Sequence, residues 1–204
     1  MLTLYHSPNS RSTRIVRLLY EMGVEDQVAI EPVSILRSDG TGGADGANPH
    51  PEGKVPLLVH DGAVISESNA IILYLTDLFP DADMGPAAGA PGRGAYLSWL
   101  AYYGNVVEPV MAISFTGVSH PALHATFRGM PELASRLSGA LQDRPFLLGE
   151  KFSAADLLLS SPFLWMPQAT PDDTAIRAWV ERCAARPAQD RVVAFDKELM
   201  AETV

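Results

Sequence analysis

The chain has 204 residues, 47% of them hydrophobic, which is enough for one large domain or two small ones with a real core. Its formal charge of -9 argues against a nucleic-acid partner, because phosphate binding needs clustered Lys and Arg. With no apolar run near the ~18 residues that span a membrane, no signal-peptide pattern and a single cysteine, we expect a soluble, cytoplasmic protein without a membrane partner, a disulfide framework or a zinc site.

Strand and helix patterns alternate over the first 80 residues. They predict strands at 2–5, 28–33, 55–59 and 63–65, and helices at 14–22 and 68–78. Asp61-Gly62 is a strong hairpin signal between the last two strands. The Gly- and Asp-rich stretch Ser38–Gly46 predicts a mobile surface loop, either a tolerated insertion or a functional lid. The order is therefore β-α-β, a loop, then β-β-α.

The remaining chain changes class after residues 80–92, which have the composition of a linker. The patterns beyond it predict helices at 93–115, 131–142, 154–165 and 174–185 and no convincing strand. Ser153 and Asp156 have capping-box spacing, so we expect them to serve folding rather than chemistry. The fold class is α/β plus all-α, with domains at 1–79 and 93–204.

Four separated motifs carry a resemblance to a known family. They are Ser7-Pro8-Asn9-Ser10-Arg11-Ser12-Thr13-Arg14, the segment from Asn48-Pro49 to Gly53-Lys54-Val55-Pro56-Leu57, Glu67-Ser68 opening a helix, and Phe152-Ser153-Ala154-Ala155-Asp156. In this order and spacing the chain resembles the bacterial cytosolic glutathione transferases. The resemblance implies a thioredoxin-like first domain, a C-terminal helical bundle, glutathione as co-substrate without a metal, and a homodimer.

The resemblance also implies which residues hold glutathione. A cis peptide at Val55-Pro56 would turn the Val55 backbone outward to pair with glutathione like an added strand. Glu67 would receive the γ-glutamyl ammonium. Ser68 would cap the helix that follows, and the free N–H groups and positive dipole end of that helix favour the carboxylate. Lys54 pairs either with the glycyl carboxylate or only with solvent.

The activating residue is expected in the loop before the first helix. A thiol with a pKa of about 8.5 is half ionised at pH 7 after a shift of about 1.5 units, or about 2 kcal/mol, which one charge-assisted hydrogen bond supplies. Because this loop has no Cys, thiol-disulfide exchange is disfavoured. The candidates are Tyr5, Ser7, Asn9, Ser10 and Ser12, and we select Ser10, nearest the position of the serine-using relatives, with Asn9 and Ser12 as alternatives.

The second substrate is expected to bind against the helical half. Large side chains that could line this pocket are Tyr102, Tyr103, Met111, Phe115 and Trp165, although such a set is also typical of plain core. The expected activity is conjugation of glutathione to a small hydrophobic electrophile. Glutathione-dependent isomerisation or reductive cleavage, or a non-catalytic ligand carrier, stay open as alternatives.

Overall fold

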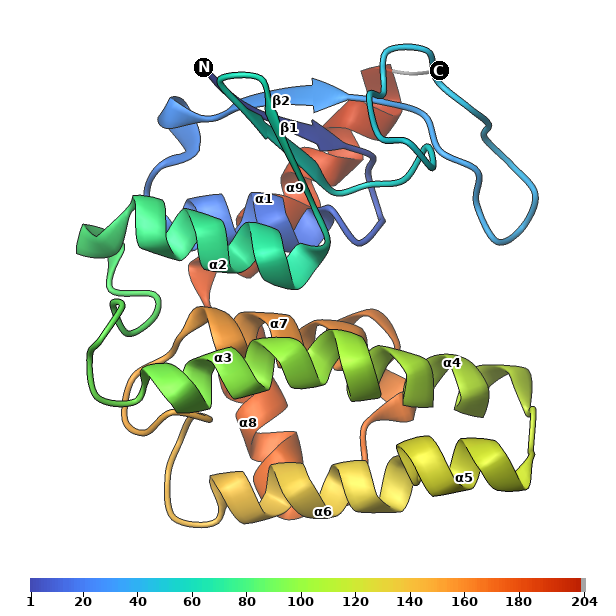
Figure 1. Ribbon diagram of the computed structural model, residues 1–204, viewed down its shortest axis with the longest axis vertical. Coiled ribbons are helices and arrows are strands. Elements are labelled where there is room, and N and C mark those ends of the chain that lie inside the picture. The colour runs from blue at the N-terminus through green and yellow to red at the C-terminus, as the bar shows by residue number, and fades with distance from the viewer. Residues whose placement is uncertain (203–204) are drawn as a thin grey trace. The chain divides into compact units, whose positions relative to one another are not determined.

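The computed structural model describes residues 1–202, and its contacts divide the chain into two compact units (Figure 1). The first unit combines residues 1–82 with the last segment of the chain, from Arg186 onward. The second unit comprises residues 83–185. Within the described part of the chain, no helix is both long and apolar enough to cross a membrane.

The first unit contains a four-stranded mixed sheet. Its strands are β1 (Leu2–His6), β2 (Ala29–Pro32), β3 (Leu57–His60) and β4 (Ala63–Ser66), in the order β2-β1-β3-β4. β1 runs parallel to β2 and antiparallel to β3, which forms the predicted hairpin with β4. The pattern of β1 alternates between buried and partly exposed positions, as expected for a strand with one face on a core.

Three α-helices accompany this sheet. They are α1 (Thr13–Met22), α2 (Ser68–Leu78) and α9 (Pro187–Glu202), and short 3₁₀ turns lie at η1 (Glu25–Gln27) and η2 (Pro80–Ala82). α1 ends where expected, because Gly23 adopts the left-handed conformation at φ 64° that suits a glycine. The predicted β-α-β then β-β-α order is confirmed, and with it the thioredoxin-like class of the first domain.

Helix α9 packs against α1 although it lies at the other end of the chain. Arg186 Nε donates to Glu21 at 2.8 Å, and Arg191 Nη2 donates to Glu25 at 2.6 Å. Phe195, on the same helix, contributes its ring to the packing. The sequence patterns did not predict a separate helix in this segment. They placed the segment in the C-terminal domain, residues 93–204, whereas the structure places it in the first unit.

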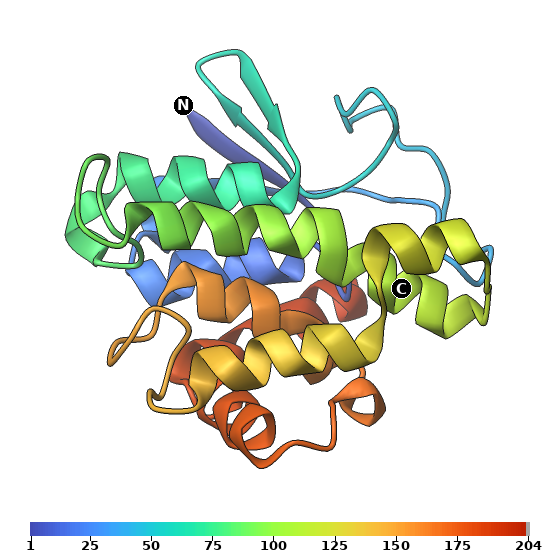
Figure 2. The same ribbon diagram turned by 60° about the horizontal axis from the view of Figure 1, so that its bottom comes forward.

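The second unit is helical in its described residues. Its helices are α3 (Arg93–Tyr102), η3 (Tyr103–Val107), α4 (Glu108–Thr116), α5 (Pro121–Phe127), α6 (Met130–Leu141), α7 (Ala154–Trp165), η4 (Pro167–Ala169) and α8 (Thr174–Ala184). Figures 1 and 2 show α3 and α4 continuing as one rod, with α5 and α6 returning alongside it. An all-helical second part is therefore confirmed.

One predicted helix, 93–115, differs in detail from the structure. Its middle is the π-helical segment η3, and α4 follows with Pro109 in its first turn. A proline has no N–H to donate to the preceding turn, so a wider turn before it accommodates the missing hydrogen bond. The predicted single helix is thus three consecutive helical pieces along one direction.

The capping box at the start of α7 is present as predicted. Asp156 is fully buried and accepts hydrogen bonds from Ser153 N at 3.0 Å, Leu147 N at 2.8 Å and Trp179 Nε1 at 2.9 Å. Burial raises the pKa of the Asp156 carboxyl more than these hydrogen bonds lower it. This carboxylate joins the loop before α7 to helix α8 inside the core of the second unit.

Candidate functional site

A cluster of serine hydroxyls occupies the loop between β1 and α1. Ser10 Oγ donates to the carbonyl oxygen of Ser7 at 2.6 Å and lies 2.7 Å from Ser12 Oγ. The backbone N–H of Ser12 donates to Ser10 Oγ at 3.1 Å, and that of Ser7 donates to Ser12 Oγ at 3.1 Å. The loop is therefore held by its own side chains, and Ser10 and Ser12 share one network.

The network continues inward to a histidine that the sequence left unassigned. His6 Nδ1 lies 2.8 Å from Ser12 Oγ, and His6 Nε2 lies 3.0 Å from Asp196 Oδ1 on α9. All three side chains are almost completely inaccessible to solvent. A line of hydrogen bonds thus runs from α9 through β1 to the loop before α1.

Asp196 also holds the loop directly. Its Oδ2 accepts from the backbone N–H of Asn9 at 2.7 Å and from Thr13 Oγ1 at 2.6 Å. Burial alone raises the pKa of the Asp196 carboxyl, but the hydrogen bonds from His6, Thr13 and Asn9 outweigh it and bring the pKa below its usual value. Asp196 is therefore an ionised acceptor at neutral pH.

The five hydroxyl and amide candidates differ in accessibility. Ser7 and Ser12 are buried, whereas Ser10 is partly exposed in the loop before α1. Asn9 is exposed, has a left-handed backbone at φ 51°, and its Nδ2 donates to Met200 Sδ at 2.9 Å. Tyr5 lies within β1 and pairs with the backbone of β3. Ser10 alone combines partial exposure with membership in the buried network.

A positive charge reaches the same loop from the Gly-rich segment. Arg37 Nη2 donates to Ser7 Oγ at 3.1 Å and to the carbonyl oxygen of Pro8 at 2.9 Å. The segment folds back on itself, since Arg37 N donates to Thr41 O at 2.9 Å. At Gly42, with φ 75°, a Cβ would lie 2.1 Å from a backbone oxygen, so only glycine fits. No local sequence pattern singles out Arg37, which lies directly before the Gly-rich stretch.

The Val55-Pro56 peptide bond is cis, as the resemblance implied. The ladder of β3 begins at Leu57, so the backbone of Val55 is not used in pairing with β1 or β4. Asn48, itself buried, donates from Nδ2 to the carbonyl oxygen of Lys54 at 3.2 Å and fixes the preceding turn. Lys54 is exposed and forms an ion pair with Glu52.

Glu67 and Ser68 open α2, but not in the roles expected for a cap. The residue before the helix is Glu67, with φ 71°, while Ser68 is the first helical residue and is buried. Glu67 occupies the cap position, and its side chain makes no capping hydrogen bond. Because Ser68 lies inside the helix, the prediction that Ser68 is the cap is wrong. A left-handed Glu costs of order 1–3 kcal/mol and such strain concentrates at ligand sites. The first N–H groups of α2 thus lie beside an acidic side chain in a strained conformation.

The five predicted pocket residues of the helical half, Phe115 included, have different environments. Tyr103 and Met111 are buried, Tyr102 is partly exposed beneath the guanidinium of Arg136 at 3.8 Å, and Trp165 is 71% exposed. The first two have the burial typical of core. Their role in a substrate pocket stays a prediction.

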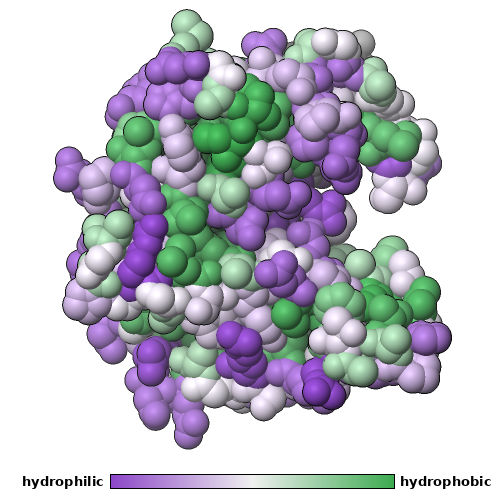
Figure 3. Space-filling model, viewed as in Figure 1, coloured by the Kyte–Doolittle hydropathy of each residue, from purple (hydrophilic) through white to green (hydrophobic). Residues whose placement is uncertain are grey.

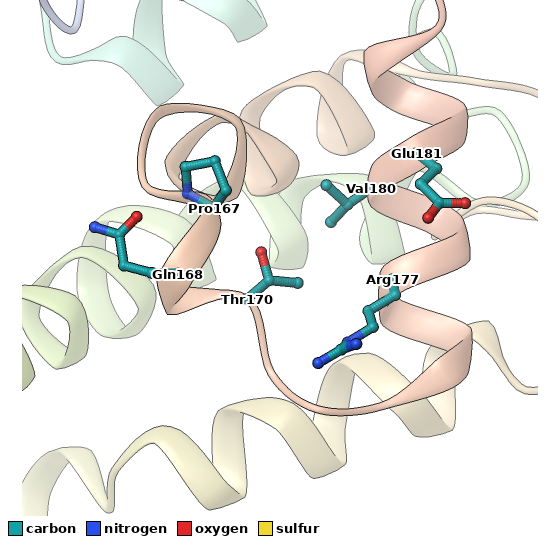
Figure 4. A pocket seen from close by; sticks show the side chains of 6 residues that line it. All are labelled: Pro167, Gln168, Thr170, Arg177, Val180 and Glu181. Atoms are coloured by element: carbon teal, nitrogen blue, oxygen red, sulfur yellow. The ribbon is translucent and has the colours of Figure 1, made fainter.

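Two hollows lie within the second unit. One, of about 400 Å³ between η4 and α8, is lined by Pro167, Gln168, Thr170, Arg177, Val180 and Glu181 (Figure 4). The other, of about 440 Å³, is lined by residues of α4, α5 and α6 and the loops between them, where Figure 3 shows hydrophobic side chains at the surface. Phe115, 81% exposed, lies at the end of α4 in this region. None of the five predicted pocket residues, Phe115 included, is among the described residues that line these two hollows.

Within residues 1–202, no three side chains of His, Cys, Asp or Glu form a cluster that could hold a metal ion. The polar residues of the site are instead hydroxyls, one imidazole, one carboxylate and one guanidinium. Such a set can position and stabilise an anion and can accept or donate protons.

Comparisons with known proteins cover both units. The family description "Glutathione S-transferase, N-terminal domain" matches residues 4–86, and "Glutathione S-transferase, C-terminal domain" matches residues 108–187. The chain is 26% identical to glutathione S-transferase GstA of Escherichia coli O157:H7 over 189 residues, 90% of this chain and 93% of that protein.

Solved structures agree with these sequence matches. The structure of a glutathione transferase from Methylococcus capsulatus strain Bath is similar with a TM-score of 0.74 and 28% identity, over 97% of this chain and 99% of the other. A sphingomonad glutathione S-transferase complexed with glutathione has a TM-score of 0.74 and 26% identity, over 96% and 98% of the two chains. The similarity therefore extends over nearly the whole length.

Proposed function

The chain belongs to the glutathione S-transferase family, and we propose that it conjugates glutathione to a small, largely hydrophobic electrophile with Ser10 stabilising the thiolate. The observation that carries the assignment is the position of Ser10, whose hydroxyl is the partly exposed end of a buried hydrogen-bond network in the loop before α1. A hydroxyl donor and a helix N-terminus both favour the ionised thiol.

Ser12 and Asn9 are weaker candidates for physical reasons. Ser12 is fully buried, and its oxygen already contacts His6, Ser7 and Ser10. Asn9 is accessible, but its side-chain amide donates to Met200. Ser10 is the hydroxyl that an incoming sulfur reaches with the smallest rearrangement.

The rest of glutathione is assigned to the neighbouring strand and helix. The free backbone of Val55, next to the cis Pro56, suits the cysteinyl backbone of the tripeptide. The N-terminus of α2 with Ser68 suits the γ-glutamyl carboxylate, and Glu67 its ammonium. Lys54 is exposed and pairs only with the neighbouring acid Glu52 in the ion pairs described, so it is within reach of the glycyl carboxylate.

Retention on immobilised glutathione together with turnover of an aryl halide tests the activity. Ser10→Ala should lower turnover about 10²-fold, the usual loss for one donor to a developing anion, and leave glutathione affinity within a few-fold. Full activity of Ser10→Ala with loss in Asn9→Ala or Ser12→Ala would overturn the assignment. Retention without conjugation would redirect the proposal to isomerisation, reductive cleavage or ligand carriage. An activated cis-alkene tests isomerisation, a disulfide or thioether tests reductive cleavage, and turnover of none of them would leave ligand carriage.

We also propose that the protein is a homodimer and that it is located in the cytoplasm. We further propose that the electrophile binds in the region of Tyr102, Tyr103, Met111 and Trp165. The family membership supports each of these statements. Light scattering of the purified chain tests the first, and a monomeric mass would contradict it. Substitution of Trp165, the most exposed of the four, should change KM for the electrophile and not for glutathione.

A further inference from the structure

His6 is a buried, titratable side chain that the contacts proposed for glutathione do not use. Both ring nitrogens are engaged, Nε2 by Asp196 at 3.0 Å and Nδ1 by Ser12 at 2.8 Å. The ring is completely shielded from solvent. It is nevertheless connected, through a single intervening hydroxyl, to the proposed thiolate-stabilising residue.

The hydrogen bonds of Asp196 determine where the protons of this network lie. Its Oδ2 accepts from Asn9 N–H and the Thr13 hydroxyl, and its Oδ1 accepts from His6 Nε2–H. A neutral imidazole has only one N–H, so Nδ1 is an acceptor and the hydroxyl of Ser12 donates to it. Ser12 Oγ is then available as acceptor for the hydroxyl of Ser10, 2.7 Å away.

We propose that His6 accepts the thiol proton of glutathione through Ser10 and Ser12, and that Asp196 is the positioning residue for its ring. The inference rests on the proposed function, in which the sulfur lies against Ser10. In this step the thiol proton moves to Ser10 Oγ, the Ser10 proton moves to Ser12 Oγ, and the Ser12 proton moves to His6 Nδ1. One proton is transferred in total, so the sulfur becomes a thiolate, the imidazole an imidazolium, and both hydroxyls are restored.

The products of this transfer suit the surrounding groups. The imidazolium lies against the ionised carboxylate of Asp196, which orients the ring and offsets its charge. The hydroxyl of Ser10 now holds the former thiol proton and donates it to the thiolate. The guanidinium of Arg37, bound to Ser7 in the same loop, adds a positive charge near the developing anion.

The relay also frees Ser10 from a competing acceptor. Ser10 Oγ also lies 2.6 Å from the carbonyl oxygen of Ser7, which accepts a hydrogen bond but passes no proton on. While the Ser10 proton lies there, Ser10 offers the sulfur a lone pair rather than a donor. Movement of that proton to Ser12 removes the conflict without displacing the loop.

Proton counting on the unmodified protein tests the relay. The protein is mixed with glutathione at pH 7 in weak buffer, with thiolate followed by its ultraviolet absorbance and released protons by an indicator dye. S-methylglutathione, which has no thiol proton, gives the proton release of binding alone. We expect far less than one proton released per thiolate formed, because His6 retains it. Release of one proton per thiolate would overturn the proposal, and absence of the thiolate band would overturn the proposed function instead.

Variants give a second test. His6→Gln, which cannot take up the proton, should release one proton per thiolate and lose about 100-fold in kcat/KM, the lower end of the range for general acid–base catalysis. His60→Gln is the matched control, because His60 contacts Tyr74 away from the network and should leave both values unchanged. Should His6→Gln fail to fold, the imidazole ¹⁵N signals of the unmodified protein decide. They should show imidazolium with glutathione and neutral imidazole with S-methylglutathione, and a neutral ring in both complexes would contradict the relay.

Discussion

Two buried aspartates, Asp156 in the second unit and Asp196 in the first, each accept at least three hydrogen bonds. The donors of Asp156 are backbone groups, a capping serine and a tryptophan, all inside the core. Those of Asp196 include a histidine that leads on to a partly exposed hydroxyl. An aspartate therefore stabilises the fold in the second unit and supports the candidate site in the first. The difference is that the donors of Asp156 all lie in the core, whereas one donor of Asp196 connects it to the accessible hydroxyl of Ser10.

The largest expected effect is the loss of the Asp156 carboxylate. Asp156→Ala leaves several buried donors without an acceptor and should lower the free energy of unfolding by about 3–5 kcal/mol. Urea unfolding measures this loss, with exposed Asp143→Ala as the control that leaves the curve unchanged. If folded Asp156→Ala protein lost the thiolate band of the glutathione complex, the purely structural role of this residue would be wrong.

A smaller loss of stability and a larger loss of chemistry are expected for Asp196→Asn. The amide of the variant has one oxygen that can accept, and its NH₂ group cannot accept from the donors of Asn9 and Thr13. The free energy of unfolding should therefore fall by about 1–3 kcal/mol. The thiolate band at pH 7 should fall markedly, because the His6 ring is no longer held in the required tautomer. Asp156→Asn, measured in parallel, should retain the band. Thiolate bands of equal intensity in the two variants would contradict the different roles proposed for the two aspartates.

The pH dependence of stability should have opposite signs at the two positions. The pKa of Asp196 is lowered on folding, so its contribution is present above the unfolded value of about 3.9 and is lost as pH falls below it. The stability gap between the protein and Asp196→Asn should therefore shrink below about pH 4. The pKa of Asp156 is raised, so the gap to Asp156→Asn should shrink as pH rises. Urea titrations at several pH values give both slopes, and slopes of the same sign would refute the assignment.

The smallest effect is expected at the edge of the Asp196 region. Met200→Leu removes the sulfur that accepts from Asn9 Nδ2 but keeps the apolar volume, so stability should stay within about 0.5 kcal/mol. If Ser10 is the donor to the thiolate, the thiolate band should also be unchanged. A clear change in the band would show that the orientation of the Asn9 amide matters and would favour Asn9.

Much of the fold could be predicted because its signals are local. The alternation of strands and helices, the hairpin at Asp61-Gly62 and the capping box at Ser153 each depend on a few neighbouring residues. The π-helical segment before Pro109 was missed, since a regular apolar period does not reveal a single wider turn. Helices α5 and α9 were missed as well, and no local pattern indicates against which unit a terminal helix packs.

The site was predicted only in part, for the same reason. The Val55-Pro56 peptide bond is cis, as its motif implied, and the loop around Ser10 lies between β1 and α1, while the role of Ser10 stays a prediction. The link between His6 and Asp196 spans 190 residues, and one aspartate in a helix has no distinguishing neighbours. One signal was available, because His6 continues the buried alternation of β1, and a buried imidazole requires partners.

The bond between His6 and Asp196 also has a consequence for the order in which the protein is made. Translation at about 5–20 residues per second needs roughly 10–40 s to cover the 190 residues between the two partners. During that interval the nascent chain holds β1 and the loop around Ser10 without the carboxylate that orders them. Ribosome-bound chains that end before α9 should therefore contain the strands and helices of the thioredoxin-like sheet but lack the contacts of Asp196 to His6 and Asn9. At this stage the incomplete site is open to binding by a chaperone.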